Sequence, residues 1–223
     1  MTIKAVIFDK DGTLVDMNAT WGRAMSRTIE HLCNDDEQKR LLSHNLGLNL
    51  ATGTFSEDSV APRTTWSNLR AIIATAIDPD EFAKWNRQYA AEALAPTPTA
   101  IETIETLHAT GYKLALATNH IVEPTMHQLE LLEIDKYFTC VLAADSGFGS
   151  KPEPGMVLEA MRQLDTTTDN CVMVGDTTSD LGAAKAAGLP YFQLGKLAMN
   201  NTGFEPDFQM SQIDELINLL PTL

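Results

Sequence analysis

The hydrophobic pattern of the chain changes after its first strand and again near residue 96. Residues 3–8 form a short apolar run, which is typical of a strand buried on both faces of a sheet. From about Asn18 to Leu94 apolar residues recur every three or four positions, as in Trp21, Ala24, Met25, Ile29 and Leu32. This spacing predicts further helices near 35–46, 64–77 and 79–94, with a polar loop over 52–62.

After Pro96 and Pro98 the pattern alternates between helices and strands. The expected strands lie near 112–117, 138–143, 171–174 and 190–194, and the expected helices lie near 98–109, 123–133, 154–164, 178–187 and 211–220. Such alternation predicts a parallel sheet covered on both faces. We therefore expect an α/β fold with a Rossmann-like parallel-sheet core, formed by residues 1–16 and 96–223, and an inserted α-helical domain over 17–95.

Charge narrows the classes of partner. The 223 residues carry a formal net charge of −14, which argues against nucleic acid and anionic membrane surfaces as partners. Residues 17–95 hold eight of the 16 basic and ten of the 30 acidic residues, so the acidity belongs mainly to the core. An acidic core that handles an anionic substrate would need a local cation.

Cysteine usage and the N-terminus indicate the compartment. Cys33, Cys140 and Cys171 are far apart and form no metal-ligand motif, which favours reduced thiols. No apolar run approaches about 18 residues, and the chain enters its first strand with no signal-like segment. We expect a soluble cytoplasmic protein.

Candidate chemistry begins where the first strand ends. Asp9 and Asp11 lie two residues apart before Gly12, so in extended chain both carboxylates face the same side. An ordinary acidic turn is the alternative interpretation. In the same extended chain Lys10 points away from both acids, and its charge is available either to reach the insert or to screen them.

Three later strand ends add polar groups. Thr118 and Asn119 follow a strand of small residues, where a hydroxyl and free N–H groups could hold a phosphate or simply cap a helix. Lys151 lies in a proline-containing segment, directly before Pro152, either as a phosphate-neutralising cation or as a surface lysine. Asp176 and Asp180 lie four residues apart after another strand, where hard oxygen ligands suit Mg²⁺. The alternative is that one aspartate caps the following helix and the other is solvated.

In their order, these four motifs resemble those of the haloacid dehalogenase-like (HAD) hydrolase superfamily. Asp9 to Asp16 match its D-x-D-G-T-[LV]-x-D signature, and the resemblance covers nearly the whole chain. The insert resembles that family's helical cap. The Lys-Pro-x-Pro and Gly-Asp-x-x-x-Asp stretches resemble its phosphoglycolate phosphatase-like branch, which handles diverse substrates.

The resemblance implies a role for each core residue. Asp9 would be the nucleophile that forms an aspartyl-phosphate, and Asp11 would protonate the leaving oxygen and later activate water. Mg²⁺ would bind the Asp9 carboxylate, the Asp11 carbonyl and Asp176, with Asp180 acting through water or through Lys151. The phosphoryl oxygens would be held by Thr118, the Asn119 N–H and Lys151.

The expected function is therefore Mg²⁺-dependent hydrolysis of a small phosphorylated metabolite such as phosphoglycolate, a sugar phosphate or a nucleotide. An acid at Asp11 disfavours a dehalogenase or a phosphonate hydrolase, because neither needs to protonate a leaving alkoxide. A phosphotransferase or phosphomutase and a non-catalytic binding module remain as alternatives.

The sequence says less about substrate choice. The loop 52–63 is a candidate for facing the substrate, and Ser59, Arg63 and Thr64 could bind a polar or anionic tail. Trp21 either contacts the substrate or packs in the core of the insert. His120 either touches the leaving group or is structural. Oligomeric state stays open.

Overall fold

The computed structural model describes residues 2–64, 66–196 and 203–223, and the chain divides into two compact units. The first unit contains Met1–Val15 and Pro96–Leu223, and the second contains Asp16–Ala95. The second unit is thus inserted into the first shortly after the first strand. Among the described residues no helix combines the length and the apolar character that crossing a membrane requires.

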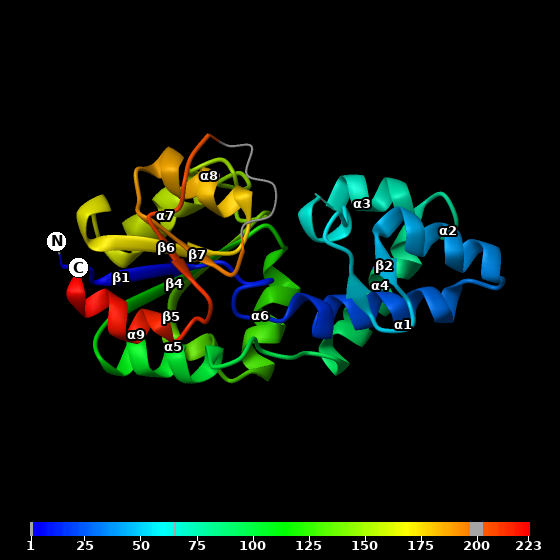
Figure 1. Cartoon of the computed structure of the whole chain (residues 1–223), viewed down its shortest axis with the longest axis horizontal. Coiled ribbons are helices and arrows are strands. Elements are labelled where there is room, and N and C mark those ends of the chain that lie inside the picture. Colours follow the sequence, from blue (N-terminus) through cyan, green and yellow to red (C-terminus); the bar gives the residue numbers. More distant parts are fainter. Residues whose placement is uncertain (1, 65, 197–202) are drawn as a thin grey trace. The chain divides into compact units, whose positions relative to one another are not determined.

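The first unit is built on a six-stranded parallel sheet with the order β5-β4-β1-β6-β7-β8 (Figure 1). Its strands are β1 (Ala5–Phe8), β4 (Lys113–Thr118), β5 (Phe138–Ala143), β6 (Cys171–Gly175), β7 (Tyr191–Leu194) and β8 (Phe208–Met210). Every residue of β1 and of β6 is buried, which explains why these strands read as unbroken apolar runs. The first strand of the chain therefore lies inside the sheet, between β4 and β6.

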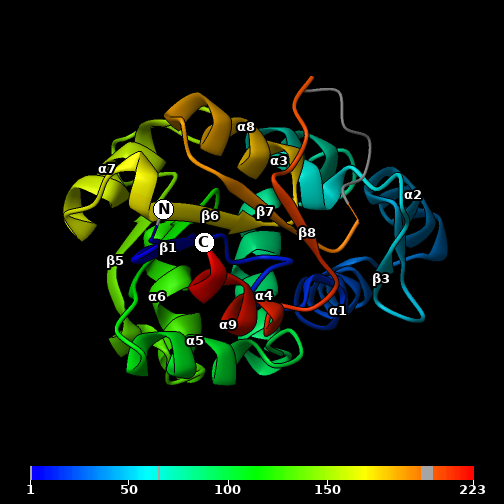
Figure 2. The same cartoon turned by 60° about the vertical axis from the view of Figure 1, so that its left-hand side comes forward.

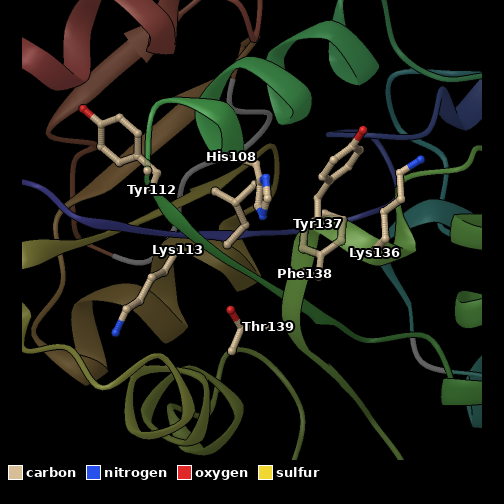
Figure 3. Close-up of a pocket in the computed structure, with 9 residues that line it drawn as sticks. His108, Tyr112, Lys113, Lys136, Tyr137, Phe138 and Thr139 are labelled. Carbon is tan, nitrogen blue, oxygen red and sulfur yellow. The ribbon is translucent and has the colours of Figure 1, made fainter.

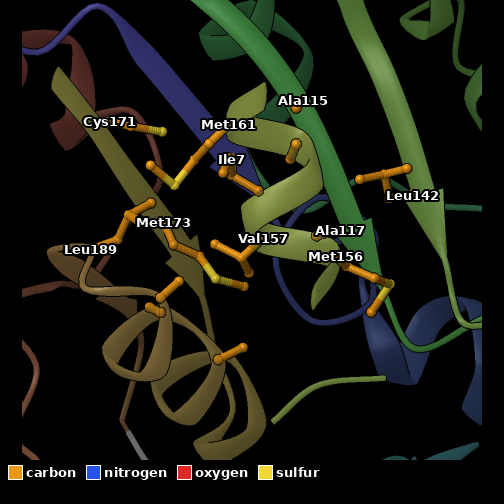
Figure 4. Close-up of a cluster of buried hydrophobic side chains, with 14 of the residues drawn as sticks. Ile7, Ala115, Ala117, Leu142, Met156, Val157, Met161, Cys171, Met173 and Leu189 are labelled. Carbon is orange, nitrogen blue, oxygen red and sulfur yellow. The ribbon is translucent and has the colours of Figure 1, made fainter. Parts of the chain in front are cut away.

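Helices cover both faces of this sheet (Figures 1 and 2). One face carries α7 (Gly155–Leu164) and α8 (Thr178–Ala187), and the other carries α5 (Ala100–Ala109), α6 (Val122–Leu131) and α9 (Glu215–Leu219). Side chains alternate between the faces, so Ile7 packs with α7 and α8 (Figure 4) while Phe8 packs with α5 and α6. This alternation decides which side chains meet at the end of β1.

The second unit is mainly helical. It contains a π-helical turn (Asn18–Gly22), α1 (Arg23–Leu32), α2 (Asp36–Leu46), α3 (Trp66–Ile73), α4 (Pro79–Glu92) and a hairpin of β2 (Leu48–Asn49) and β3 (Thr54–Phe55). The hairpin packs against the start of α1, since a Cβ on Gly22 would lie 1.9 Å from the Gly53 carbonyl oxygen. Asn18 fixes this contact by accepting a 2.9 Å hydrogen bond from the Phe55 N–H through its side-chain oxygen.

The parallel α/β architecture and the predicted core strands are confirmed. The sequence pattern missed β8 and the β2–β3 hairpin, because two or three residues give no measurable periodicity. The predicted helix over 64–77 is shorter, with α3 at Trp66–Ile73, and the one over 211–220 is reduced to α9 followed by a 3₁₀ turn at Leu220–Thr222.

Candidate active site

The strand order places the predicted site residues at one edge of the sheet. β1, β4 and β6 are adjacent and parallel, so their carboxyl ends carry Asp9, Thr118 and Asp176 to the same edge. Lys151 lies in the segment between β5 and α7 and reaches this edge from the α7 side. The site therefore follows from the rule that open α/β sheets bind ligands beyond the carboxyl ends of their strands.

Lys151 is the cation at the centre of this group. Its Nζ lies 2.6 Å from Asp9 Oδ1, 2.6 Å from Asp180 Oδ1 and 2.7 Å from the Ala117 carbonyl oxygen. Only 5% of Lys151 and 5% of Asp9 is exposed. Lys151 is therefore buried in contact with Asp9, and its alternative as a surface lysine is wrong.

Asp180 is held by the first turn of α8. Its Oδ2 accepts hydrogen bonds from the Thr177 N–H at 3.0 Å and from the Thr177 hydroxyl at 2.6 Å, while Thr177 caps the helix in return. Since Oδ1 faces Lys151, both carboxylate oxygens are engaged by the protein. Asp180 is thus a capping residue of α8, as in the alternative interpretation, and also a member of the candidate site.

Asp176 lies against the turn that follows Asp11. Gly12 has φ +92°, and a Cβ there would lie 2.3 Å from Asp176 Oδ2, so only glycine lets the two segments approach this closely. The Thr13 hydroxyl donates a 3.1 Å hydrogen bond to Asp176 Oδ1. Thr13 was not among the predicted site residues, although its place in the signature was a signal for it.

The electrostatics of the site are dominated by excess negative charge. One carboxylate oxygen from each of Asp9, Asp176 and Asp180 lies within 4.8 Å of the others. Burial raises the pKa of Asp9 to about 7, the Asp180 carboxylate adds to this increase, and Lys151 opposes it. Burial and then the Asp9 and Asp180 carboxylates raise the pKa of Asp176 well above its usual range.

Lys151 stays charged in this surrounding. Burial would lower its pKa, but the carboxylates of Asp180 and Asp9 outweigh burial and raise it. One ammonium therefore faces three carboxylates, a cluster that attracts a further cation.

The Asn119 side chain clamps the backbone of Lys151. Its Nδ2 donates to the Lys151 carbonyl oxygen at 2.9 Å, and its Oδ1 accepts from the Lys151 N–H at 2.8 Å. Thr118 is 2% exposed, and its Oγ1 accepts a 3.2 Å hydrogen bond from the His120 N–H. The amide side chain thus places the lysine, a role that the sequence did not suggest.

Asp11 lies beside Lys10. The Lys10 Nζ is 2.5 Å from Asp11 Oδ1 and 2.6 Å from Gln128 Oε1. We expected Lys10 to point away from both acids if the chain stayed extended. The chain is not extended here, because β1 ends at Phe8 and the chain turns after Lys10. Gln128 gave no signal in the sequence, since 118 residues separate it from Lys10.

The residues suggested for substrate binding belong to the second unit, apart from His120. Trp21 is 5% exposed and packs with Ala24, Tyr89 and Ala90, which favours its packing interpretation. Ser59 is 2% exposed, and its hydroxyl donates to the Leu46 carbonyl at the end of α2. The side chain of Arg63 lies outside the described residues, and Thr64 follows a 3₁₀ turn at Ala61–Arg63.

A cavity of about 320 Å³ lies at the opposite edge of the sheet, where β4 and β5 begin. Figure 3 shows that its two lysines, Lys113 and Lys136, point in different directions. The Lys113 Nζ donates to the Leu164 carbonyl oxygen at 2.6 Å, and the Lys136 Nζ lies 5.1 Å from the centroid of the Tyr137 ring. Since these polar groups do not converge, the carboxyl edge remains the candidate active site.

Residues 6–194 match the family of haloacid dehalogenase-like hydrolases, and the chain belongs to this family. The match spans the strands that carry Asp9, Thr118 and Asp176 and includes the helical unit. The resemblance noted in the sequence is thereby confirmed, and the chain is a hydrolase of this family.

Relatives that match the chain over nearly its whole length carry phosphatase names. The pyrophosphatase PpaX of Halalkalibacterium halodurans is 27% identical over 223 residues, covering 99% of this chain and 98% of the relative. A phosphoglycolate phosphatase of Aquifex aeolicus is 24% identical over 231 residues, covering 98% and 97%. The crystal structure of a putative β-phosphoglucomutase from Thermotoga maritima shares the fold, with a TM-score of 0.71, 22% identity and coverage of 99% and 100%.

Proposed function

We propose that this protein is a Mg²⁺-dependent phosphatase that hydrolyses a small phosphorylated metabolite through an aspartyl-phosphate. The observation that carries the proposal is the buried contact between Asp9 and Lys151, 2.6 Å apart, beside Asp176 and Asp180. This arrangement offers a carboxylate nucleophile and a fixed cation at the same place. Phosphoryl transfer needs just such positioning and charge neutralisation.

In the first step the Asp9 carboxylate attacks phosphorus and the bond to the leaving oxygen breaks. The leaving oxygen takes a proton from the Asp11 carboxyl group, so it departs as an alcohol. In the second step Asp11 removes a proton from water as the water oxygen attacks phosphorus. Phosphate then leaves, and the Asp9 carboxylate is regenerated.

The donor set fits Mg²⁺. Asp9 and Asp176 supply carboxylate oxygens, the ligands that this cation prefers, and burial together with the neighbouring carboxylates raises the pKa values of both groups. We assign the metal to Asp9, Asp176 and the Asp11 carbonyl. Asp180 is not a direct ligand in this assignment, because its oxygens are engaged by Lys151 and Thr177. When bound, Mg²⁺ neutralises charge on the phosphoryl oxygens and on Asp9.

Thr118, the Asn119 N–H and Lys151 hold the phosphoryl oxygens in this proposal. The Thr118 hydroxyl lies at the end of β4, and Asn119 fixes the Lys151 backbone by two hydrogen bonds. The ammonium group of Lys151 is thus oriented before substrate arrives, which avoids reorganisation during the reaction.

The helical unit Asp16–Ala95 is the cap in this proposal, and its loop 52–63 is the candidate for selecting the leaving group. Phosphoglycolate, sugar phosphates, nucleotides and, by analogy with PpaX, pyrophosphate form the substrate class. The buried positions of Trp21 and Ser59 assign them to the structure of this unit.

The decisive experiment measures phosphate release from a panel of these compounds, with Mg²⁺ and with EDTA, for wild type and Asp9→Asn. We expect activity on a few compounds that is lost with EDTA and in the variant. Asp169→Asn serves as the matched control, since it is an exposed aspartate before β6 in the same unit. Unimpaired hydrolysis by folded Asp9→Asn would remove Asp9 as the nucleophile.

A phosphomutase is separated by product analysis. Accumulation of a sugar bisphosphate without free phosphate would show that the phosphoryl group is transferred to a sugar and not to water. Free phosphate as the main product favours the phosphatase.

A further inference from the structure

Lys10 is a completely buried cation to which the proposed reaction gives no part. It is 0% exposed, and its ammonium contacts the carboxylate of Asp11 at 2.5 Å and the amide oxygen of Gln128 at 2.6 Å. Taking an ammonium group out of water costs several kcal/mol unless strong partners replace the water. A lysine in this position therefore calls for an explanation.

The alternation of β1 explains where Lys10 goes. Val6 and Phe8 face α5 and α6, and Lys10 continues this side, whereas Asp9 continues the side of Ile7 and meets Lys151. Beyond the strand the chain turns, and the Lys10 carbonyl oxygen accepts hydrogen bonds from the N–H groups of Leu14 at 2.8 Å and Val15 at 2.9 Å. This turn brings Asp11 back to the Lys10 ammonium.

Gln128 fixes the other side of the ammonium group. It is 3% exposed and lies in α6, so it ties Lys10 to a helix that packs on the sheet. An ammonium only donates hydrogen bonds, hence the carbonyl oxygen of the amide must face it. Gln128 thereby supplies an acceptor without adding a second negative charge.

We propose that Lys10, anchored by Gln128, positions the Asp11 carboxyl group to protonate the leaving oxygen. The inference rests on the proposed function, in which Asp11 is the proton donor. Lys10 acts through Asp11 and is a positioning residue. A displacement of about 1 Å at a reacting group can lower a rate about 100-fold. The gain in rate from a fixed Asp11 would therefore explain why a lysine is kept buried beside it.

The test compares two substrates of similar shape that differ in their need for a proton. Nitrophenolate leaves 4-nitrophenyl phosphate readily, whereas phenolate, the more basic leaving group, gains more from protonation. The value of kcat/KM covers the steps up to departure of this group, so the later action of Asp11 on water does not enter. The readout is the ratio of kcat/KM for phenyl phosphate to that for 4-nitrophenyl phosphate.

Four variants are compared with wild type. Asp11→Asn should lower the ratio most, about 100-fold, because it removes the acid. Lys10→Met keeps the length of the side chain and should lower the ratio about tenfold, and Gln128→Met should lower it about threefold. Thr125→Val is the matched control: Thr125 is a buried polar residue one turn earlier in α6, and its substitution should leave the ratio unchanged.

Equal losses on both substrates in folded Lys10→Met would overturn the inference and leave Lys10 as a structural counter-charge. If Lys10→Met does not fold, Gln128→Met decides in the same way, since it leaves both charges in place. An unchanged ratio in Asp11→Asn would instead remove the proton donor from the proposed function. The two failures are therefore distinguishable.

Discussion

Two buried lysines stand on opposite faces of the sheet at the end of β1, and their surroundings differ in charge. On the α7 and α8 side, Lys151 contacts Asp9 and Asp180 and lies near Asp176. On the α5 and α6 side, Lys10 contacts Asp11 and the neutral amide of Gln128. We call these the Lys151 cluster and the Lys10 cluster.

The difference in charge indicates that the two clusters at the end of β1 have different tasks. The Lys151 cluster carries more negative charge than its lysine balances, which prepares it for a metal ion and disfavours it as a purely structural ion pair. In the Lys10 cluster the ammonium contacts one carboxylate and one neutral amide oxygen. Such an arrangement suits the fixing of a side chain in one position.

Lys151→Met should have the largest effect. Removing this ammonium leaves three neighbouring carboxylates without it, so stability should fall by about 3–5 kcal/mol and phosphate release by about 1,000-fold. Denaturant unfolding and kinetics measure both. In Lys10→Met the loss of stability should be smaller, since Asp11 is 18% exposed and keeps access to water. Equal losses in the two variants would break the comparison.

Mg²⁺ should stabilise wild type by about 2.7 kcal/mol when its concentration is 100 times the Kd. Asp176→Asn should lose most of this stabilisation, whereas Lys10→Met should keep it, because the proposed carboxylate ligands, Asp9 and Asp176, lie in the Lys151 cluster and Lys10 is not among the proposed ligands. Thermal unfolding with and without Mg²⁺ measures the shift. The same shift in Asp176→Asn as in Asp169→Asn would contradict the assigned ligand.

The metal-free protein should lose stability as pH rises from about 4 to 7. The pKa of Asp9 is raised to about 7 in the folded chain, so the folded state binds more protons than the unfolded state between the ordinary carboxyl pKa and 7. The slope of stability against pH is negative in that window, and it should flatten in Asp9→Asn. Unfolding in EDTA at several pH values measures it, and an identical slope in this variant would exclude Asp9 as its source.

Thr177→Ala should have the smallest effect. It removes the capping hydroxyl of α8 and one donor to Asp180, so stability should fall by about 1 kcal/mol, equivalent to about 2–4 °C in Tm. Activity should decline only moderately, because Lys151 still holds Asp180 Oδ1. A Tm unchanged within error would show that the cap contributes nothing measurable.

The sequence by itself determined the parallel sheet and predicted the segments, near the ends of its strands, in which Asp9, Lys151, Asp176 and Asp180 lie. These features are local, because strand periodicity, turn residues and short motifs are written in consecutive positions. The parallel arrangement then brings strand ends to one edge, so the grouping of these residues followed from the fold class alone.

Only the tertiary structure decided the partners of Lys10 and the clamp of Asn119 on Lys151. Residue 128 lies 118 positions after Lys10, and position 119 lies 32 before Lys151, so no local pattern links them. The same holds for Gly12, whose need for glycine arises from the closeness of Asp176. Such contacts depend on how strands and helices pack, and the physical reason is that burial forces each ammonium and carboxylate to find partners wherever the fold supplies them.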